Sequence, residues 1–213
     1  MRSILAALLL GLPAVAVAQP APPSLFPTRD VAVTYRTSGA PHGVPQEVQM
    51  AWLVSGHLMR VDLPAGAQAG PMAGGWMLLD QRNNRAQVVM EHQRLVMQVD
   101  GRTMPGGQGF NPSPNARFTR EGTERVAGTN CTTWRVEDAG HAARACLTED
   151  GVLLRVQNDA QPGQVLEATR ISYGAQDPAR FQVPAGFQPL DVTRMLQGMQ
   201  RGGAPGAPAA PAR

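Results

Sequence analysis

The sequence predicts a mainly β fold of the α+β class, in which an antiparallel sheet is followed by one short C-terminal helix. Two observations predict the sheet: apolar and polar residues alternate with a period of two through the middle of the chain, and turn-forming residues separate these stretches about every ten positions. The third observation is that the most convincing helical spacing of apolar residues comes near the end of the 213 residues. We expect a single domain over residues 30–201.

The first expected strands form a meander. Val31, Val33 and Tyr35 alternate along the first strand, Met50 and Trp52 along the second. After the Ser-Gly turn at 55–56, the pattern continues with strands at 58–63, 76–80, 87–90 and 95–99. Residues 101–115 are rich in glycine and proline, so they are expected to form a long connection between the two halves of the sheet.

The second half contains five more expected strands and the helix. The strands lie at residues 118–120, 132–136, 143–148, 152–157 and 165–173. Asp191 is a suitable N-cap, and the apolar residues Val192, Met195, Leu196 and Met199 recur at the spacing of one helix face. We therefore expect an amphipathic helix over 191–201 that packs against the sheet.

Both ends of the chain are expected to lie outside this core. Residues 1–18 have the layout of a signal peptide: a positive start, a short apolar run, and the small residues before a cleavage between Ala18 and Gln19. The apolar run is too short to span a bilayer, so the mature chain is predicted to be periplasmic without a membrane span. The proline-rich lead-in 19–29 and the Gly/Ala/Pro tail 202–213 are not expected to join the core.

Charge and aromatic content argue against nucleic acid as a partner. Cleavage after Ala18 removes Arg2, which leaves 18 basic and 16 acidic residues, a net charge of +2. Aromatic residues make up only 5% of the chain, too few for a base-stacking surface. The basic residues are all arginine, which we interpret as a mark of genome composition.

The two cysteines, Cys131 and Cys146, are predicted to form a structural disulfide. Strand parity places both on the face opposite Trp134 and Leu147, and an oxidising compartment permits the bond. A two-residue hairpin at Asp150-Gly151 would pair Leu147 with Leu154, and Cys146 with Arg155. A redox or nucleophilic role is not favoured, because the pair lacks a C-x-x-C spacing.

No catalytic residues, cofactor site or metal site are predicted. The four histidines lack a zinc-binding spacing, and no nucleophile motif or phosphate loop is present. One metal alternative remains: a copper-type site of methionine and histidine, drawn from Met59 with His57, and from Met90, His92 and Met97. The competing interpretation is that these methionines fill the core.

Three segments of the sequence resemble a known group. They are VAG-x-x-C-x-x-W at 126–134, CLTEDGVLLR at 146–155 and DPARFQVPAGF at 177–187. These resemble exported proteobacterial proteins of unknown function that are similar to the LolA/LolB-like superfamily of lipoprotein carriers and receptors. The resemblance implies an antiparallel sheet curled into an unclosed half-barrel around a helix, with an apolar concave face. No carrier-specific residue can be transferred.

The expected function is therefore non-enzymatic binding at the concave face. The ligand would be a lipid, an acyl chain or a hydrophobic segment of a partner protein. Five residues on apolar faces are candidates to line it: Met50, Trp52, Met59, Trp76 and Trp134. The alternative is that these side chains are simply buried against the C-terminal helix.

Overall fold

A computed structural model describes residues 22–39, 46–64, 74–100, 112–113 and 115–190. Its strands and two short 3-10 helices are β1 (Val31–Ser38), β2 (Glu47–Leu53), η1 (Val54–Gly56), β3 (Leu58–Asp62), β4 (Trp76–Asp80), β5 (Arg85–Met90), β6 (Leu95–Asp100), β7 (Arg117–Val126), β8 (Thr129–Asp138), β9 (His141–Leu147), β10 (Leu153–Asn158), β11 (Val165–Tyr173), η3 (Pro178–Phe181) and β12 (Gln188–Pro189). The signal peptide, the helix expected over 191–201 and the C-terminal tail lie outside the described residues.

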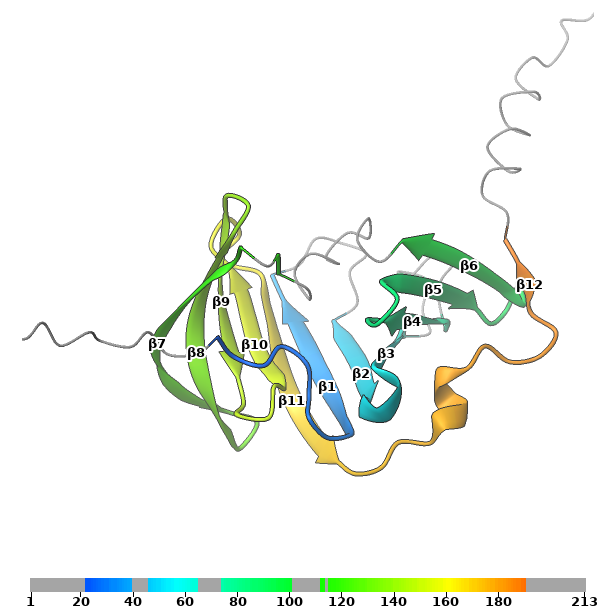
Figure 1. Ribbon diagram of the computed structural model, residues 1–213, viewed down its shortest axis with the longest axis horizontal. Coiled ribbons are helices and arrows are strands. Elements are labelled where there is room, and N and C mark those ends of the chain that lie inside the picture. Colours follow the sequence, from blue (N-terminus) through cyan, green and yellow to red (C-terminus); the bar gives the residue numbers. More distant parts are fainter. Residues whose placement is uncertain (1–21, 40–45, 65–73, 101–111, 114, 191–213) are drawn as a thin grey trace, which may run out of the picture.

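All the strands form one sheet of twelve, in the order β12-β6-β5-β4-β3-β2-β1-β11-β10-β9-β8-β7. Neighbouring strands are antiparallel except β12, a short strand parallel to β6 that the sequence did not predict. The long-range pairing of β1 with β11 joins the two meanders (Figure 1). Because β12 and β7 are edge strands at opposite ends of this order, the sheet is not closed, as expected for a half-barrel.

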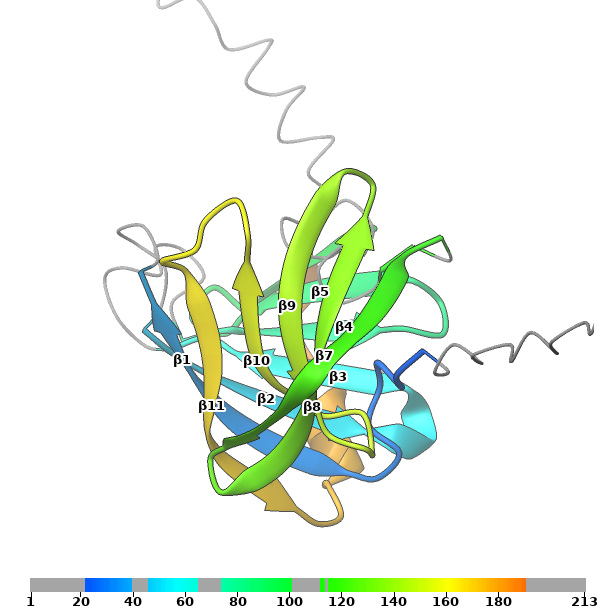
Figure 2. The same cartoon turned by 90° about the vertical axis from the view of Figure 1, so that its left-hand side faces the viewer.

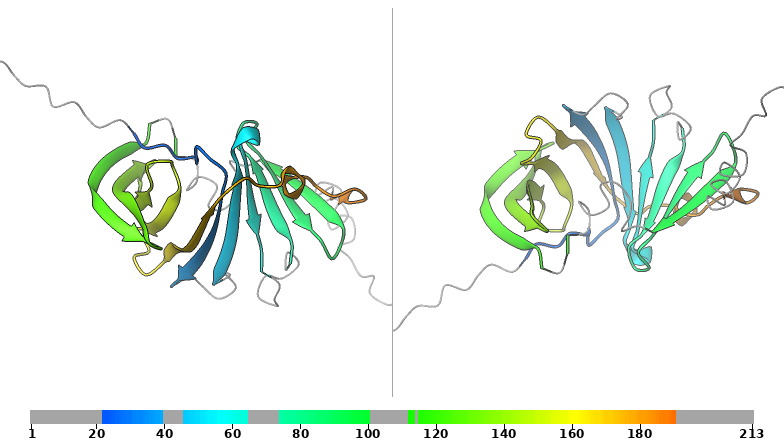
Figure 3. Two further views of the ribbon diagram at one scale, coloured as in Figure 1. Left: turned by 90° about the horizontal axis from the view of Figure 1, so that it is seen from below. Right: turned by 90° about the horizontal axis from the view of Figure 1, so that it is seen from above.

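The two halves of the sheet curve differently. Strands β7–β11 coil tightly, which brings β7 close to β11, whereas β2–β6 spread out as a fan (Figures 2 and 3). The three register shifts in the strand pairing involve strands of the coiled half, at Thr34/Tyr35, Arg120/Gly122 and Leu153/Arg155. A β-bulge increases local twist and bends its strand, so these irregularities account for the tighter coil.

The buried apolar residues form two cores. The alternating residues of β1–β3 contribute Val33, Met50 and Met59 to the larger core, which continues into the coiled half and also includes Cys131 and Cys146. The opposite face buries Trp76 and Val89, among others, and Phe181 of η3 covers them. The segment after β11 therefore runs past the fan, below β2–β4 in the view of Figure 1, before it forms β12.

The N-terminal lead-in corrects one expectation. Residues 19–29 were expected to lie outside the core, yet Pro27 is buried and Phe26 packs against the larger core. The backbone N–H of Thr28 also donates to the carbonyl oxygen of Asp150, at 3.0 Å. Residues 25–29 are therefore part of the folded domain. The prediction failed because proline-rich composition says little about packing when a preformed apolar surface is available.

Candidate functional site

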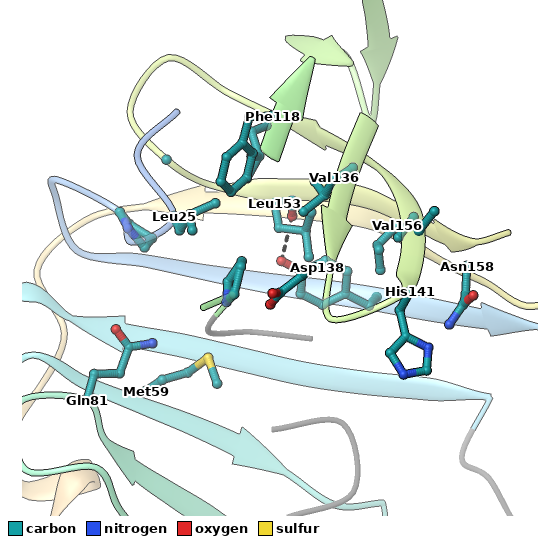
Figure 4. A pocket seen from close by; sticks show the side chains of 18 of the residues that line it. Leu25, Met59, Gln81, Phe118, Val136, Asp138, His141, Leu153, Val156 and Asn158 are labelled. Carbon is teal, nitrogen blue, oxygen red and sulfur yellow. Dashed lines mark hydrogen bonds between the residues drawn. The ribbon is translucent and has the colours of Figure 1, made fainter. Parts of the chain in front are cut away.

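An apolar cavity of about 420 Å³ lies between the coiled half of the sheet and strands β1–β3. One wall comes from Tyr35, Trp52 and Met59 on β1–β3. The facing wall comes from the ends of β7–β10 and includes Phe118, Val136, Ala143, Ala145, Leu147, Leu153 and Val156. Figure 4 shows Phe118, Val136 and Leu153 on one side of this space and Met59 on the other. Its volume is within the range of small-molecule binding sites, about 300–1,000 Å³.

The facing wall is not filled in the way a protein core is. Phe118, Val136, Leu153 and Val156 are only half-buried, although they point into the molecule. Protein interiors are normally packed as densely as organic crystals, because a void forfeits dispersion contacts. Half-exposed apolar side chains around a space of this size are typical of a binding site.

The N-terminal segment closes one side of the cavity. Leu25 and Pro27 both line it, and Leu25 is 37% exposed. Between them Phe26 points the other way and stacks on the ring of His57, with centroids 5.7 Å apart. This ring pair, together with the Thr28 hydrogen bond, anchors the segment across the cavity.

The turn between β9 and β10 supports this segment. Asp150 accepts hydrogen bonds from the side chains of Arg29 (2.7 Å), Thr148 (2.6 Å) and Tyr173 (3.2 Å), and Arg29 also lies over the Tyr173 ring. Partial burial by itself would raise the pKa of Asp150, but these hydrogen bonds and the Arg29 charge outweigh it and lower the pKa.

This turn differs from the predicted two-residue hairpin. The N–H of Thr148 donates to the carbonyl of Val152, so three residues form the loop, and Gly151 adopts the left-handed conformation at φ +84°. Consequently Leu153, and not Leu154, lies opposite Leu147. The bulge that follows restores the expected pairing of Cys146 with Arg155.

Besides the Tyr35 hydroxyl, four polar side chains lie around the cavity: Gln81, Asp138, His141 and Asn158. Asp138 accepts the backbone N–H and the hydroxyl of Ser113, at 2.7 and 2.6 Å. These two hydrogen bonds, the hydroxyl first, lower the pKa of Asp138. Because the Ser113 hydroxyl donates directly to a carboxylate that is a weak base, the pair does not have the arrangement that activates a serine nucleophile.

The five predicted lining residues are distributed over three environments. Trp52 and Met59 line the cavity, and Met50 lies on the same strand face within the larger core. Trp134 is buried on the face that Ala145 and Leu147 present to the cavity, but it is not among the described lining residues. Trp76 lies on the opposite face, under Arg60, and its indole N–H donates to Glu91.

The residues that sequence reasoning missed lie mainly on β7–β10 and in the lead-in. Val136 and Val156 belong to expected strands, and their parity with Leu147 could have placed them on the cavity face. Leu25 and Pro27 carried no such signal. Tyr35 was assigned to an apolar strand face, but it also has a polar role: its hydroxyl donates to the carbonyl of Leu153 at 2.7 Å (Figure 4). Burial raises the pKa of this phenol.

The disulfide between Cys131 and Cys146 is present, with Cα atoms 5.4 Å apart. The pairing of Thr133 with Cys146, and of Trp134 with Ala145, places the bridge on the face opposite the cavity. Both cysteines are buried. The bridge therefore ties β8 to β9 without contributing to the lining.

The copper alternative gains no support from the geometry. His57 stacks on Phe26 and its Nδ1 is 3.0 Å from the Arg82 guanidinium, whereas Met59 belongs to the cavity wall. His92 is exposed in the turn after β5, and Met90 is buried in the sheet. Within the described parts of the chain, no three histidine, cysteine or acidic residues are grouped in a way that could hold a metal ion.

A family model described as a domain of unknown function, DUF4412, matches residues 41–155, more than half of the chain. The chain belongs to the DUF4412 family. The matched range runs from before β2 to within β10, so it includes much of the cavity wall but not the lead-in. A comparison with curated proteins finds no match. None of the helices in the described residues is long and apolar enough to cross a bilayer.

Solved structures similar to this DUF4412 chain show low identity. An uncharacterized conserved protein from Thermus thermophilus has 14% identity and a TM-score of 0.50, covering 76% of this chain and 90% of that one. The LolA superfamily protein NE2245 from Nitrosomonas europaea has 10% identity and a TM-score of 0.40, covering 74% and 91%. The Pseudomonas aeruginosa MucA/MucB complex has 15% identity and a TM-score of 0.46, covering 76% and 58%. The expected likeness to domains of unknown function and to LolA superfamily structures is thus found.

Proposed function

We propose that this DUF4412 protein is an exported, non-enzymatic binding protein that holds one acyl chain or a similar apolar chain in the cavity between the coiled half and strands β1–β3. The observation that carries the proposal is the half-exposed apolar wall around an unfilled space of about 420 Å³. Transfer of an apolar chain into such a space is favourable by about 25 cal/mol for each Å² removed from water. The signal-peptide pattern of residues 1–18 supports export to the periplasm.

An acyl chain suits the cavity better than a protein segment does. Leu25 and Pro27 close one side, which favours an occupant that enters with one end and stops. A peptide passing through the cavity would also bring backbone N–H and C=O groups that need hydrogen-bond partners. Most of the lining is apolar and would leave these groups without partners. A hydrophobic partner segment stays the second candidate occupant.

The first test is to purify the mature chain from a periplasm and to analyse it by native mass spectrometry and lipid extraction. We expect an adduct with the mass of a single-chain lipid. Titration with the uncharged dye N-phenyl-1-naphthylamine should then show saturable binding that the extracted lipid displaces.

A cavity-filling variant links this binding to the cavity. Ala143 is half-buried on the cavity face of β9, so Ala143→Phe places a ring in the space. We expect at least a tenfold loss of dye affinity, while the matched variant Ala143→Ser, which keeps the volume, retains it. The proposal fails if the wild-type chain neither carries lipid nor binds the dye, or if Ala143→Phe binds as well as wild type and both variants remain folded.

A further inference from the structure

The cavity has one fixed charge. Among its described lining residues Asp138 is the only acidic side chain, and no arginine is present. The other polar lining groups are the amides of Gln81 and Asn158, the His141 ring and the Tyr35 hydroxyl, which is already bonded to Leu153. A ligand in this cavity therefore meets an apolar wall and, at one place, a carboxylate.

The carboxylate is held in position. Asp138 is the last residue of β8, and Ser113 donates to each of its two oxygens, so its orientation does not depend on a ligand. Each carboxylate oxygen can accept a further hydrogen bond. Figure 4 shows the carboxylate below Leu153, beside the apolar wall. The two hydrogen bonds also lower its pKa, so it is ionised at neutral pH.

Two side chains are candidates for a competing positive charge. His141 pairs with Asp138 across the β8–β9 hairpin and contributes to lowering the pKa of Asp138. Arg117 is the other. It lines a shallow depression at the tip of the β8–β9 hairpin together with Glu137, and this depression shares Asp138 and His141 with the cavity. Arg117 does not line the cavity itself. The paired register also places it beside Glu137, a second carboxylate.

We propose that the cavity selects an apolar chain whose polar end is a cation, such as an alkylammonium group, over one that ends in a carboxylate. This inference rests on the proposed function and names the class of ligand for that site. A cationic end beside the carboxylate can pair with Asp138, whereas an anionic end would be brought close to a fixed negative charge. Because Asp138 is only half-buried, salt screens this interaction in part.

The test compares three ten-carbon ligands below their micelle concentrations: decylammonium, decanoate and uncharged decanol. Each displaces N-phenyl-1-naphthylamine from the mature protein at pH 7 and low ionic strength. We expect decylammonium to bind at least tenfold more tightly than decanoate, with decanol between them. Higher salt should reduce the difference.

Two neighbouring substitutions separate the local charge from the net charge. Asp138→Asn should reduce the preference for decylammonium to less than threefold. Glu137→Gln makes the same change in net charge on the opposite, exposed face of β8, and should retain the preference. Because Asp138→Asn also alters the Ser113 contacts, Ser113→Ala serves as a second variant: it keeps the charge and should keep a preference above threefold.

The outcomes distinguish the two proposals. If none of the three ligands displaces the dye, the proposed function fails. If decanol binds but decanoate binds as tightly as decylammonium or more tightly, the function stands and the charge selection is wrong. Equal loss of preference in Asp138→Asn and Glu137→Gln would also overturn it, because the effect would then come from net charge.

Discussion

The disulfide between Cys131 and Cys146 is predicted to stabilise the fold without taking part in binding. The bridge joins residues 15 apart in the sequence. Closing a loop of this length in the unfolded chain is worth about 3 kcal/mol in the chain-entropy model. For a chain of this size each kcal/mol changes Tm by about 2–4 °C, so the reduced protein should melt about 6–12 °C lower.

Urea titration of the wild-type chain, equilibrated with and without the reductant TCEP, measures this contribution. Both cysteines are buried, so the reduced samples must be equilibrated from the unfolded state. The double variant Cys131→Ala and Cys146→Ala is the control, since its stability should not depend on reductant. Dye affinity of the reduced, folded protein should match that of the oxidised protein, because the bridge lies on the face opposite the cavity.

Two results would refute this reasoning. A stability difference below about 1 kcal/mol would mean that the unfolded chain is not constrained as the loop model requires. Loss of dye binding with unchanged stability would mean that the sulfurs serve the site directly. In that case the strand parity that separates them from the cavity would be wrong.

Three further predictions concern the elements around the cavity. Gly151→Ala should lower the free energy of unfolding by about 1–3 kcal/mol more than Gly140→Ala does, as measured in urea titrations. Both glycines have positive φ, but only a Cβ at 151 would meet backbone atoms, at 2.5 Å. Equal losses of stability would refute the close approach of the N-terminal segment. Tyr35→Phe should destabilise by about 1–2 kcal/mol, because it leaves a part-buried carbonyl of β10 without its hydroxyl donor; a neutral result would indicate that water replaces it. Because the pKa of Asp150 is lowered in the folded state, its stabilising contribution is present above its unfolded pKa of about 3.9 and is lost as pH falls through the folded pKa. The decrease in Tm between pH 6 and pH 2 should therefore be smaller for Asp150→Asn than for the wild-type chain.

Much of the sheet could be predicted because its information is local. Alternation along each strand decides which side chains share a face, and it correctly placed Trp52 with Met59, and Cys131 opposite Trp134. The same alternation with a period of two also predicted where most of the strands lie. The length of the hairpin β7–β8 was underestimated, since the polar residues 120–125 break the alternation although they pair with residues 130–134 of β8.

The cavity could not be predicted in the same way. Its two walls meet only because β1 pairs with β11, strands more than 125 residues apart, and no local pattern specifies that pairing. The coil that narrows the space depends on bulges, which shift the register by one residue and are invisible in a period-two pattern. The three-residue loop before β10 placed Leu153 opposite Leu147 in place of Leu154, and the bulge that follows restored the expected register at Arg155.

The sequence by itself determined the mainly β class, the faces of the strands and the position of the disulfide, because each of these depends on neighbours along one strand or one hairpin. Only the tertiary structure decided which face encloses a cavity, that residues 25–29 close it, and that Asp138 supplies its single fixed charge. These properties depend on contacts between segments far apart in the chain, and the packing of the whole sheet selects those contacts.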